Sequence, residues 1–301
     1  MDRPSGIHLV GDLYFTLREC RTMSTYKLIL STKNHYDMSV EDQIRLFKKV
    51  GFDGFFAEWD NEETINKLCK LSDELDMMFQ SVHGPYTGCM DIWKGGQVAE
   101  KAAEEILECV RACGQAGVPI VVLHPYYTFD LRFGPNPEGI EYFRRILEEA
   151  KKYGLKIAIE NVEGEEHMDM IFRELGDYDN LGFCWDTGHE HCYSELDFID
   201  LYGDRLIGTH INDNLGRSDA SGRNDSKDDL HLLPFDGDID WNEIAARLKS
   251  TGFEGPLTFE LKKITKFGQW QKPEYLEMSM EEYVEEAYRR AVKFTEYVKE
   301  A

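Results

Sequence analysis

Six side chains that can bind a metal ion or transfer a proton lie at the ends of six successive apolar, β-branched runs. They are His83, His124, Glu160, Asp186, His210 and Glu260. Imidazole and carboxylate groups are the usual ligands of Zn²⁺, Mn²⁺ and related cations. Several carboxylates buried around one centre without a cation would repel each other and lose their hydration. The set therefore predicts a metal site, although each member taken singly also suits a structural role.

The runs that end on these residues alternate with helical patterns along the whole chain. Eight strands are expected at 26–33, 54–59, 78–85, 120–127, 156–164, 181–189, 206–214 and 255–262. Helices are expected at 40–51, 62–76, 98–117, 139–154, 168–176, 195–204, 240–252 and 280–301. This alternation indicates parallel strands joined by crossovers, and eight units predict a single-domain α/β fold, the (β/α)₈ TIM barrel. An open doubly wound sheet is the alternative, but the glycine-rich turn it usually carries is missing after the first strand.

A TIM barrel collects the carboxyl ends of its strands at one rim, where active sites form. The six side chains are therefore expected to share one mouth. His189 follows Asp186 by three residues, where the chain turns over that mouth, and is expected as a further ligand or a substrate contact. Glu58 and Trp59 end the second strand and are expected to face the same pocket as substrate-binding residues.

Two parts of the chain lie outside the repeating units. Residues 1–22 precede the first strand and are expected to be an N-terminal extension, with the barrel at 23–301. The connections 214–239 and 263–279 are longer than the others, and loops of this length usually have a function or form subunit contacts. The aromatic residues of 263–279 favour a homo-oligomer.

Composition narrows the class of partner. The 301 residues carry a formal net charge of −23, which disfavours nucleic acid because binding to phosphates needs clustered Lys and Arg. No apolar run approaches the roughly 20 residues that span a bilayer, and the first residues lack a signal-peptide pattern. Seven cysteines without C-x-x-C spacing indicate reduced thiols. The sequence predicts a cytoplasmic protein with a small-molecule ligand and no membrane partner.

Five segments at the strand ends form a recognisable combination. They are IENV at 159–162, WDTGH at 185–189, HIND at 210–213, DLHLLPFDGDIDW at 229–241 and FEL at 259–261. Together they resemble the xylose isomerase-like TIM barrel superfamily, which includes sugar and sugar-phosphate isomerases and epimerases and also endonuclease IV. The resemblance extends from about Lys27 to the final helix.

The resemblance to the isomerases and epimerases implies one divalent ion, Mn, Mg, Co or Zn, held by four side chains. These are Glu160, Asp186, His210 and Glu260. It also implies that a sugar or sugar phosphate approaches the ion through adjacent oxygens. Glu160 and Glu260 then serve as acid and base at the carbon alpha to the carbonyl, through an enediolate, while His189 places a substrate oxygen.

The resemblance implies less about the substrate. Ketose 3-epimerases carry a second substrate-binding Glu shortly after the strand-five ligand and an Arg after the strand-seven His. Glu166 and Arg217 match these positions only loosely. Lys262 shares a strand face with Glu260 and is expected either to meet a sugar phosphate or to be solvated. Trp59 is expected either to stack on a sugar ring or to pack in the core.

The endonuclease IV branch implies a different centre, with three zinc ions that activate water and hold a phosphodiester. All nine of its ligand positions have a suitable residue here: His83, His124, Glu160, Asp186, His189, His210, Asp229, His231 and Glu260. The sugar enzyme is favoured because residues 231–241 read like the isomerase-like members and because basic residues near the rim are few. A related inositol-derivative dehydratase is a further alternative, since the same metal and base suit it.

Overall fold

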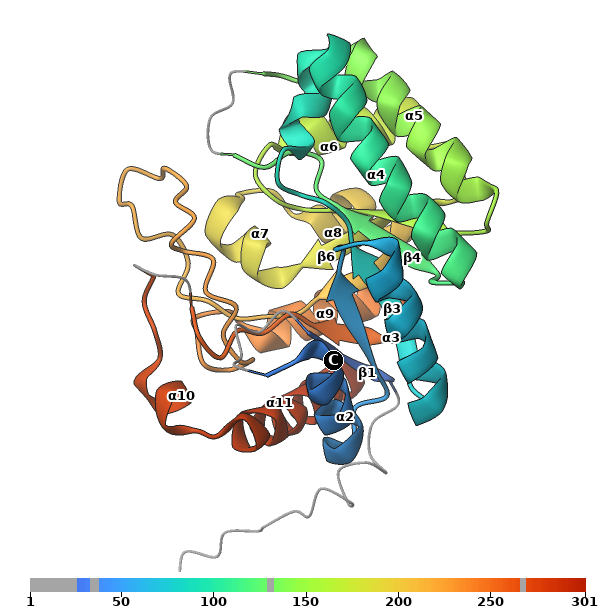
Figure 1. Cartoon of the computed structure of the whole chain (residues 1–301). Helices are drawn as coiled ribbons and strands as arrows, with labels where there is room; N and C mark the ends of the chain where they lie inside the picture. The colour runs from blue at the N-terminus through green and yellow to red at the C-terminus, as the bar shows by residue number, and fades with distance from the viewer. Residues whose placement is uncertain (1–25, 33–37, 129–132, 266–268) are drawn as a thin grey trace, which may run out of the picture.

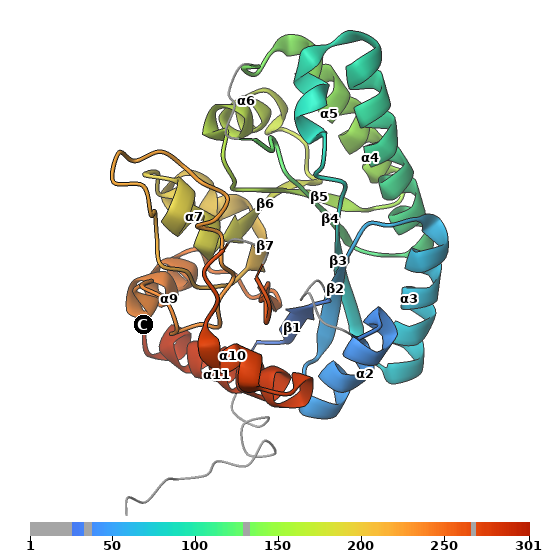
Figure 2. The same ribbon diagram turned by 60° about the vertical axis from the view of Figure 1, so that its left-hand side comes forward.

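The computed structural model describes residues 26–32, 38–128, 133–265 and 269–301. Eight parallel strands form a nearly closed barrel, and the helices surround it (Figure 2). The strand order is β7-β6-β5-β4-β3-β2-β1-β8, so β1 pairs with both β2 and β8. The predicted single-domain (β/α)₈ TIM barrel is confirmed. The predicted extension at 1–22 lies outside the described residues.

The strands are short and lie inside the predicted ranges. They are β1 (Leu28–Ser31), β2 (Gly54–Glu58), β3 (Met78–His83), β4 (Ile120–Leu123), β5 (Lys156–Glu160), β6 (Leu181–Asp186), β7 (Leu206–His210) and β8 (Leu257–Phe259). The backbone N–H of Ile211 donates to the Thr258 carbonyl at 2.8 Å, and the Thr258 N–H donates to the Thr209 hydroxyl at 3.0 Å. These bonds join β7 to β8 and close the barrel.

Helices follow the strands on the outside. They are α2 (Val40–Val50), α3 (Glu62–Leu75), α4 (Gly96–Ala116), α5 (Pro137–Lys151), α6 (Glu165–Leu175), α7 (Thr187–Tyr193), α8 (Phe198–Tyr202), α9 (Trp241–Ser250), α10 (Pro273–Glu277) and α11 (Met280–Glu300), with the 3₁₀ helices η1 (Cys89–Lys94) and η2 (Gly203–Arg205). The short elements α7, α10 and η1 were not predicted, because one or two turns are too short to give a helical period. Among the described residues, no helix is both long and apolar enough to cross a bilayer.

Several helices begin where the sequence offers a side chain that caps them. The side chains of Ser39, Asn61 and Asn136 each accept a hydrogen bond from the backbone N–H three residues later. Ser279 and Glu282 form a reciprocal capping box at the start of α11. Each such cap stabilises a helix by about 1 kcal/mol. These caps fix the points at which the chain leaves the rim and turns back along the barrel.

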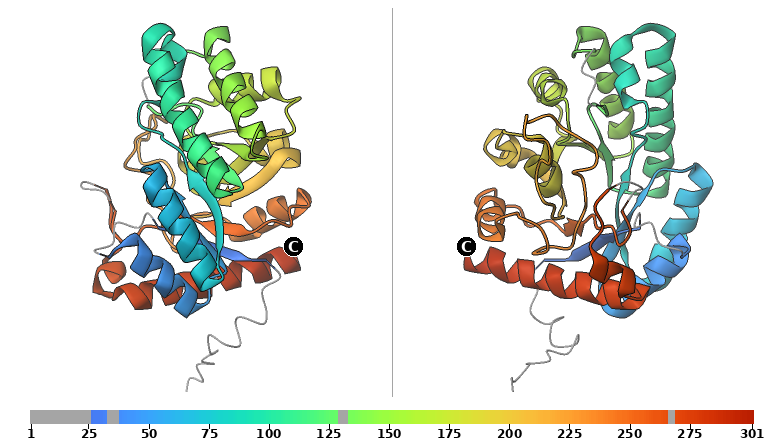
Figure 3. Two further views of the ribbon diagram at one scale, coloured as in Figure 1. Left: turned by 45° about the vertical axis from the view of Figure 1, so that its right-hand side comes forward. Right: turned by 90° about the vertical axis from the view of Figure 1, so that its left-hand side faces the viewer.

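The C-terminal helix joins the two ends of the barrel. α11 packs against both α9 and α2, so the last and first units are neighbours (Figures 1 and 3). Tyr288 of α11 meets the Phe52 ring, which follows α2, edge to face at 5.2 Å between ring centroids. The barrel therefore presents a continuous helical wall beneath the rim that carries the candidate site.

Candidate metal centre and active-site pocket

The carboxyl ends of six strands bring the predicted metal-binding side chains to one mouth of the barrel. Four of these residues end their strands, and the other two directly follow β4 and β8. None is more than 8% exposed. The six are His83, His124, Glu160, Asp186, His210 and Glu260. All six are ionisable and buried, so the distances between their side-chain atoms decide whether they can bind one metal ion or more.

Four of these side chains form one compact group, called here the four-residue centre. Its members are Glu160, Asp186, His210 and Glu260. Each offers one ligand atom, and these atoms all lie within 4.8 Å of one another. His210 Nδ1 lies 2.9 Å from Glu160 Oε1 and 3.2 Å from Glu260 Oε2. Three carboxylates and one imidazole thus converge on a volume that one cation can occupy.

A second group shares Glu160 with the first. His83 Nδ1 donates to the Gly84 carbonyl at 2.9 Å, so in the neutral ring its Nε2 is an acceptor. That Nε2 lies 3.3 Å from Glu160 Oε2 and 3.1 Å from His124 Nε2. His124 Nε2 lies 3.2 Å from the same Glu160 oxygen. His83 Nε2 and Glu160 Oε2 are then two acceptors that face each other, and a cation between them would remove their repulsion.

A third group lies on the other side of the mouth. His189 Nε2 is 3.6 Å from Asp229 Oδ1, and His231 Nε2 is 2.8 Å from the same oxygen. The Nδ1 atoms of the two rings donate to the backbone carbonyls of Asn161 and Glu260, at 3.1 and 3.0 Å. His231 adopts a φ of 49°, a left-handed conformation that is strained for a residue other than glycine. Both rings therefore direct Nε2 toward Asp229.

The chemistry of the donor set fits divalent metal. Glu160 Oε2 is buried, accepts no hydrogen bond within the described chain, and faces the Nε2 atoms of His83 and His124. Such an atom destabilises a protein by about 1–3 kcal/mol. Metal-binding histidines commonly donate their other N–H to a carbonyl, as His83 and His189 do here. Nitrogen and oxygen ligands in this combination suit Zn²⁺ or Mn²⁺.

The pKa values record how the protein balances this buried charge without a metal. Burial by itself would raise the pKa of Glu160, but His210 and His124 hold it well below its usual range. Burial would lower the pKa of His210, but Cys184 and Glu160 raise it well above the ordinary value. Burial raises the pKa of Asp186 to about 6. The pKa of His189 is raised in the same way, whereas burial lowers that of His124 to about 4. Protons on His189 and His210 thus neutralise part of the carboxylate charge, and a metal ion would displace them.

Asp186 is oriented by two asparagines from the IENV and HIND segments. Asn161 accepts from the Asp186 backbone N–H at 2.7 Å and donates to its carbonyl at 2.8 Å. Asn212 Nδ2 donates to both carboxylate oxygens, at 3.0 and 3.1 Å. A Cβ on Gly188 would lie 1.9 Å from Asn212 Oδ1, so only glycine permits this approach. Asp186 Oδ1 also accepts from the His189 N–H, which starts α7 and corrects the predicted continuation of the strand to 189.

Asp213 holds the segment 229–241, which carries the third group. Its carboxylate accepts from the Gly237 N–H and from Trp241 Nε1, both at 2.9 Å. Its backbone exchanges two hydrogen bonds with Leu232, at 3.0 and 2.7 Å. Asp213 is fully buried. The carboxylate therefore fixes the long loop against the end of β7.

We expect Asp213→Asn to lower the free energy of unfolding by about 2–3 kcal/mol, because an amide nitrogen cannot accept these donors and leaves one unsatisfied in the core. Urea denaturation followed by circular dichroism measures the change. Asp238→Asn, on an exposed residue of the same loop, is the matched control. Equal stability of the two variants would contradict the role given to Asp213.

Comparison with known proteins gives the relationship of the chain. The family model described as the xylose isomerase-like TIM barrel matches residues 44–294. The chain belongs to this family. It is 31% identical over 192 residues to the uncharacterized protein y4fM of Sinorhizobium fredii, an alignment that covers 58% of this chain and 58% of that relative. The chain thus spans little more than half of y4fM.

Two solved structures show the same barrel. A D-tagatose 3-epimerase-like protein superimposes with a TM-score of 0.69 and 21% identity, covering 91% of this chain and 98% of its own. An L-ribulose 3-epimerase superimposes with a TM-score of 0.69 and 16% identity, covering 91% of this chain and 96% of its own. At these identities the likeness establishes the fold.

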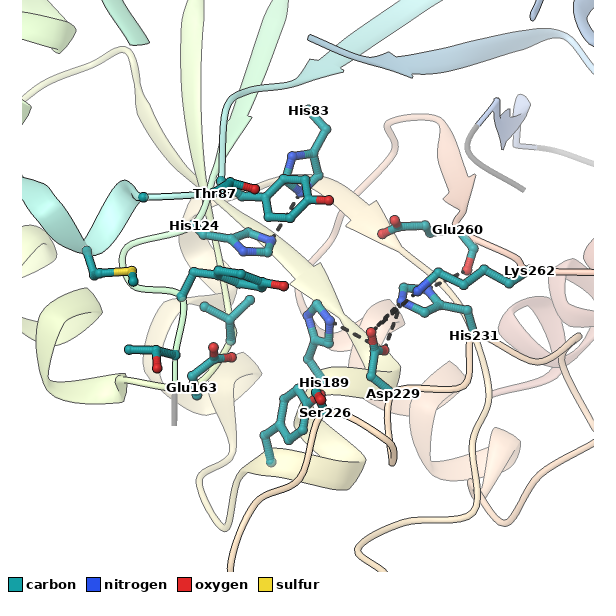
Figure 4. Close-up of a pocket in the computed structure, with 17 residues that line it drawn as sticks. His83, Thr87, His124, Glu163, His189, Ser226, Asp229, His231, Glu260 and Lys262 are labelled. Carbon is teal, nitrogen blue, oxygen red and sulfur yellow. Dashed lines mark hydrogen bonds and ion pairs between the residues drawn. The ribbon is translucent and has the colours of Figure 1, made fainter. Parts of the chain in front are cut away.

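In this xylose isomerase-like barrel a pocket of about 370 Å³ opens above the four-residue centre. Seven candidate residues line it (Figure 4): His83, His124, His189, Asp229, His231, Glu260 and Lys262. Glu160, Asp186 and His210 are the more deeply buried members, at 0–1% exposure. The Lys262 Nζ lies 3.5 Å from Asp229 Oδ2. The pocket therefore gives a ligand access to all three groups.

Glu163 also lines this pocket, and sequence reasoning missed it. It stands three residues after Glu160 and directly before Gly164, whose φ is 82°. This turn ends the strand and starts α6, which leaves Glu163 in the pocket at 7% exposure. Glu166, the loose match to the family, lies on α6 with its side chain 47% exposed. A Glu–Gly pair at a strand-to-helix turn is the sequence signal that identifies this position.

Three predicted substrate-binding residues do not line the pocket. Arg217 is turned away, because its Nη1 pairs with Glu195 Oε1 at 2.9 Å. Glu58 and Trp59 line a separate hollow of about 280 Å³. His83, Tyr86 and Thr87 line both hollows, so the chain after β3 lies between them. The expectation that Glu58 and Trp59 face the main pocket is therefore corrected, and Arg217, the loose match to the family, lies outside the lining of that pocket.

Burial raises the pKa of Glu163 to about 7, so its ionisation is coupled to stability. In the native state the carboxyl keeps its proton to a higher pH than in the unfolded chain. Its favourable contribution is present at low pH and is lost as pH rises toward 7. The glutamine variant lacks this loss. We therefore expect the free energy of unfolding of Glu163→Gln, taken relative to that of the native protein, to rise by up to about 3 kcal/mol from pH 5 to pH 8.

Urea denaturation of chelator-treated protein at pH 5 and pH 8 measures this difference. Glu166→Gln, on the exposed face of α6, should show the same small effect at both pH values. If Glu163→Gln also shifted stability equally at pH 5 and pH 8, the buried ionisation would be excluded as the cause.

Proposed function

We propose that the protein is a metal-dependent isomerase or epimerase of sugars or sugar phosphates. The observation that carries this proposal is the four-residue centre, in which Glu160 and Glu260 approach one His210 nitrogen at 2.9 and 3.2 Å. Two carboxylates around one cation site suit removal and return of a proton at a carbon next to a carbonyl. The barrel shared with the D-tagatose 3-epimerase-like protein and L-ribulose 3-epimerase supports the same reading.

The residues of the centre have separable tasks. Glu160, Asp186, His210 and Glu260 would hold the divalent ion, which supplies Lewis acidity toward a developing oxyanion when bound. One of the two glutamates takes the proton alpha to the carbonyl, and the enediolate is reprotonated by a carboxyl group. His189 Nε2 faces the pocket and orients a substrate oxygen. Lys262 supplies the positive charge that a sugar phosphate requires.

Solvent deuterium exchange tests the proposal. The protein, loaded in turn with Mn²⁺, Mg²⁺, Co²⁺ and Zn²⁺, is incubated in D₂O with a panel of ketoses, aldoses and their phosphates. Mass spectrometry should detect one deuterium at the carbon next to the carbonyl of the true substrate. Glu260→Gln should abolish this exchange with the fold retained. Absence of exchange with every sugar and every metal would overturn the proposal.

A second candidate is a zinc phosphodiesterase of the endonuclease IV type. The specific observation in its favour is that three groups of ligand atoms exist, not one, and that Glu160 belongs to two of them. Three ions so arranged can activate water and hold a phosphodiester. The net charge of −23 argues against a nucleic-acid substrate.

Metal content separates the two candidates. Elemental analysis of protein purified without chelator or added metal should give about one divalent ion per chain for the sugar enzyme. About three zinc ions, together with cleavage of abasic-site DNA, would favour the phosphodiesterase. A cytoplasmic location and a homo-oligomer complete the proposal, and sedimentation analysis tests the latter.

A further inference from the structure

The pocket has a charged side and a side rich in aromatic and apolar side chains, where Thr87, Thr128 and Glu163 also contribute to the lining. One, called here the charged wall, consists of Asp229, His231, Glu260 and Lys262. The other, called here the aromatic wall, consists of Tyr86, Met90, Tyr127, Val162 and Tyr193. In Figure 4 the labelled members of the charged wall lie on one side of the hollow, and Thr87 and Glu163, which neighbour Tyr86 and Val162 in the sequence, lie on the other.

The aromatic wall packs against histidines of the second and third groups. Tyr86 packs against His83 and His124, with ring centroids 5.5 and 5.7 Å away. Tyr86 and Tyr127 meet edge to face at 5.1 Å. Tyr193 stacks on His189 at 5.6 Å with 21° between the ring planes. Because each ring is held by a neighbour, the wall is a preformed surface that continues outward from the polar centre.

The size of the hollow allows a ligand that contacts the aromatic wall as well as the charged wall. Its volume of about 370 Å³ falls in the range of roughly 300–1,000 Å³ that encloses drug-sized ligands. Glu260 belongs both to the four-residue centre and to the charged wall, so a monosaccharide bound at that centre would lie beside this wall. Tyr86 and Tyr127 are only half-buried and present ring surface to the space that remains. Aromatic rings at such a surface favour a planar or apolar group over water.

We infer that the substrate is a sugar that carries an aromatic or apolar substituent at the end remote from the reacting carbonyl. The sugar oxygens bind at the charged wall and the substituent binds against Tyr86 and Tyr127. This inference rests on the proposed function for the reacting end of the molecule. It deepens that function by naming a two-part substrate in place of a free sugar.

Calorimetric titration tests the inference with probes that need no turnover. The 6-O-benzyl and 6-O-methyl ethers of glucose, galactose and fructose, which leave the carbonyl end of the sugar free, are titrated into the metal-loaded protein. For at least one sugar, the benzyl ether should bind at least about tenfold more tightly than the methyl ether. Tyr127→Ala should remove this preference and leave the affinity for the methyl ether within about twofold. Tyr127→Phe, which keeps the ring, should preserve the preference.

Two further variants keep the test decisive. Tyr86→Ala is an independent probe of the same wall if Tyr127→Ala fails to fold. Tyr153→Ala removes a surface ring that does not line the pocket and should leave both affinities unchanged. Equal affinity for the benzyl and methyl ethers throughout, or a preference that survives both wall variants, would overturn the inference. Neither result touches the deuterium-exchange test, so the two proposals fail separately.

Discussion

Glu160→Gln is expected to reduce turnover by about 10³-fold or more, within the range for loss of a group that transfers protons. Glu160 Oε1 lies 2.9 Å from His210 Nδ1, and Oε2 lies 3.2–3.3 Å from the Nε2 atoms of His124 and His83. The substitution keeps the volume of the side chain but replaces one acceptor oxygen by a donor. The remaining oxygen can serve only one of the two groups, so the four-residue centre and the histidine pair can no longer share this ligand.

The measurement is the steady-state rate with the sugar identified by deuterium exchange, together with the metal content of the variant. Circular dichroism establishes that the barrel is retained. Glu166→Gln is the matched control, because it makes the same chemical change on the exposed face of α6, six residues along the chain. Full activity in Glu160→Gln would sink the acid–base assignment, and it would also exclude the phosphodiesterase, which needs the same bridging ligand.

The fold and the rim residues could be predicted because a parallel barrel converts sequence position into spatial position. Every strand points the same way, so a His or Glu at the end of any apolar run reaches the same mouth. This rule needs no knowledge of which strands pair. It places His83 and Glu260 together although 177 residues of chain separate them, and the structure confirms that both line one pocket.

The remaining parts of the site depend on contacts that no periodic pattern encodes. The start of α7 is set by Asp186, which caps the helix, and by the fit of Gly188 against Asn212. The direction of Arg217 is set by Glu195, which lies on another segment. Glu163 enters the pocket because Gly164 adopts a positive φ. Each is a tertiary or conformational choice made by one or two residues.

If the proposed metal is bound, the largest effect on stability is expected from its removal. An ion present at about 1,000 times its dissociation constant stabilises a folded protein by about 4 kcal/mol. For a chain of this size that corresponds to a fall in Tm of about 10 °C on chelation. The physical reason is the burial of Glu160, Asp186 and Glu260 around one point at 6% exposure or less. Without the ion, the protons held by His189 and His210 compensate part of this charge.

Protonation of these two histidines makes the stabilisation by metal depend on pH. Burial opposes the charged form of His189, but Asp186 and Asp229 raise its pKa well above the ordinary value, and the His210 pKa is raised likewise. A metal ion must displace these protons, so it binds more tightly as the pH rises. Differential scanning fluorimetry of chelator-treated protein, with and without Mn²⁺ or Zn²⁺, should therefore show a larger rise in Tm at pH 8 than at pH 6. Glu160→Gln should reduce that rise at both pH values, whereas a Tm that no metal changes would mean that the buried acidic centre is held together by protons alone.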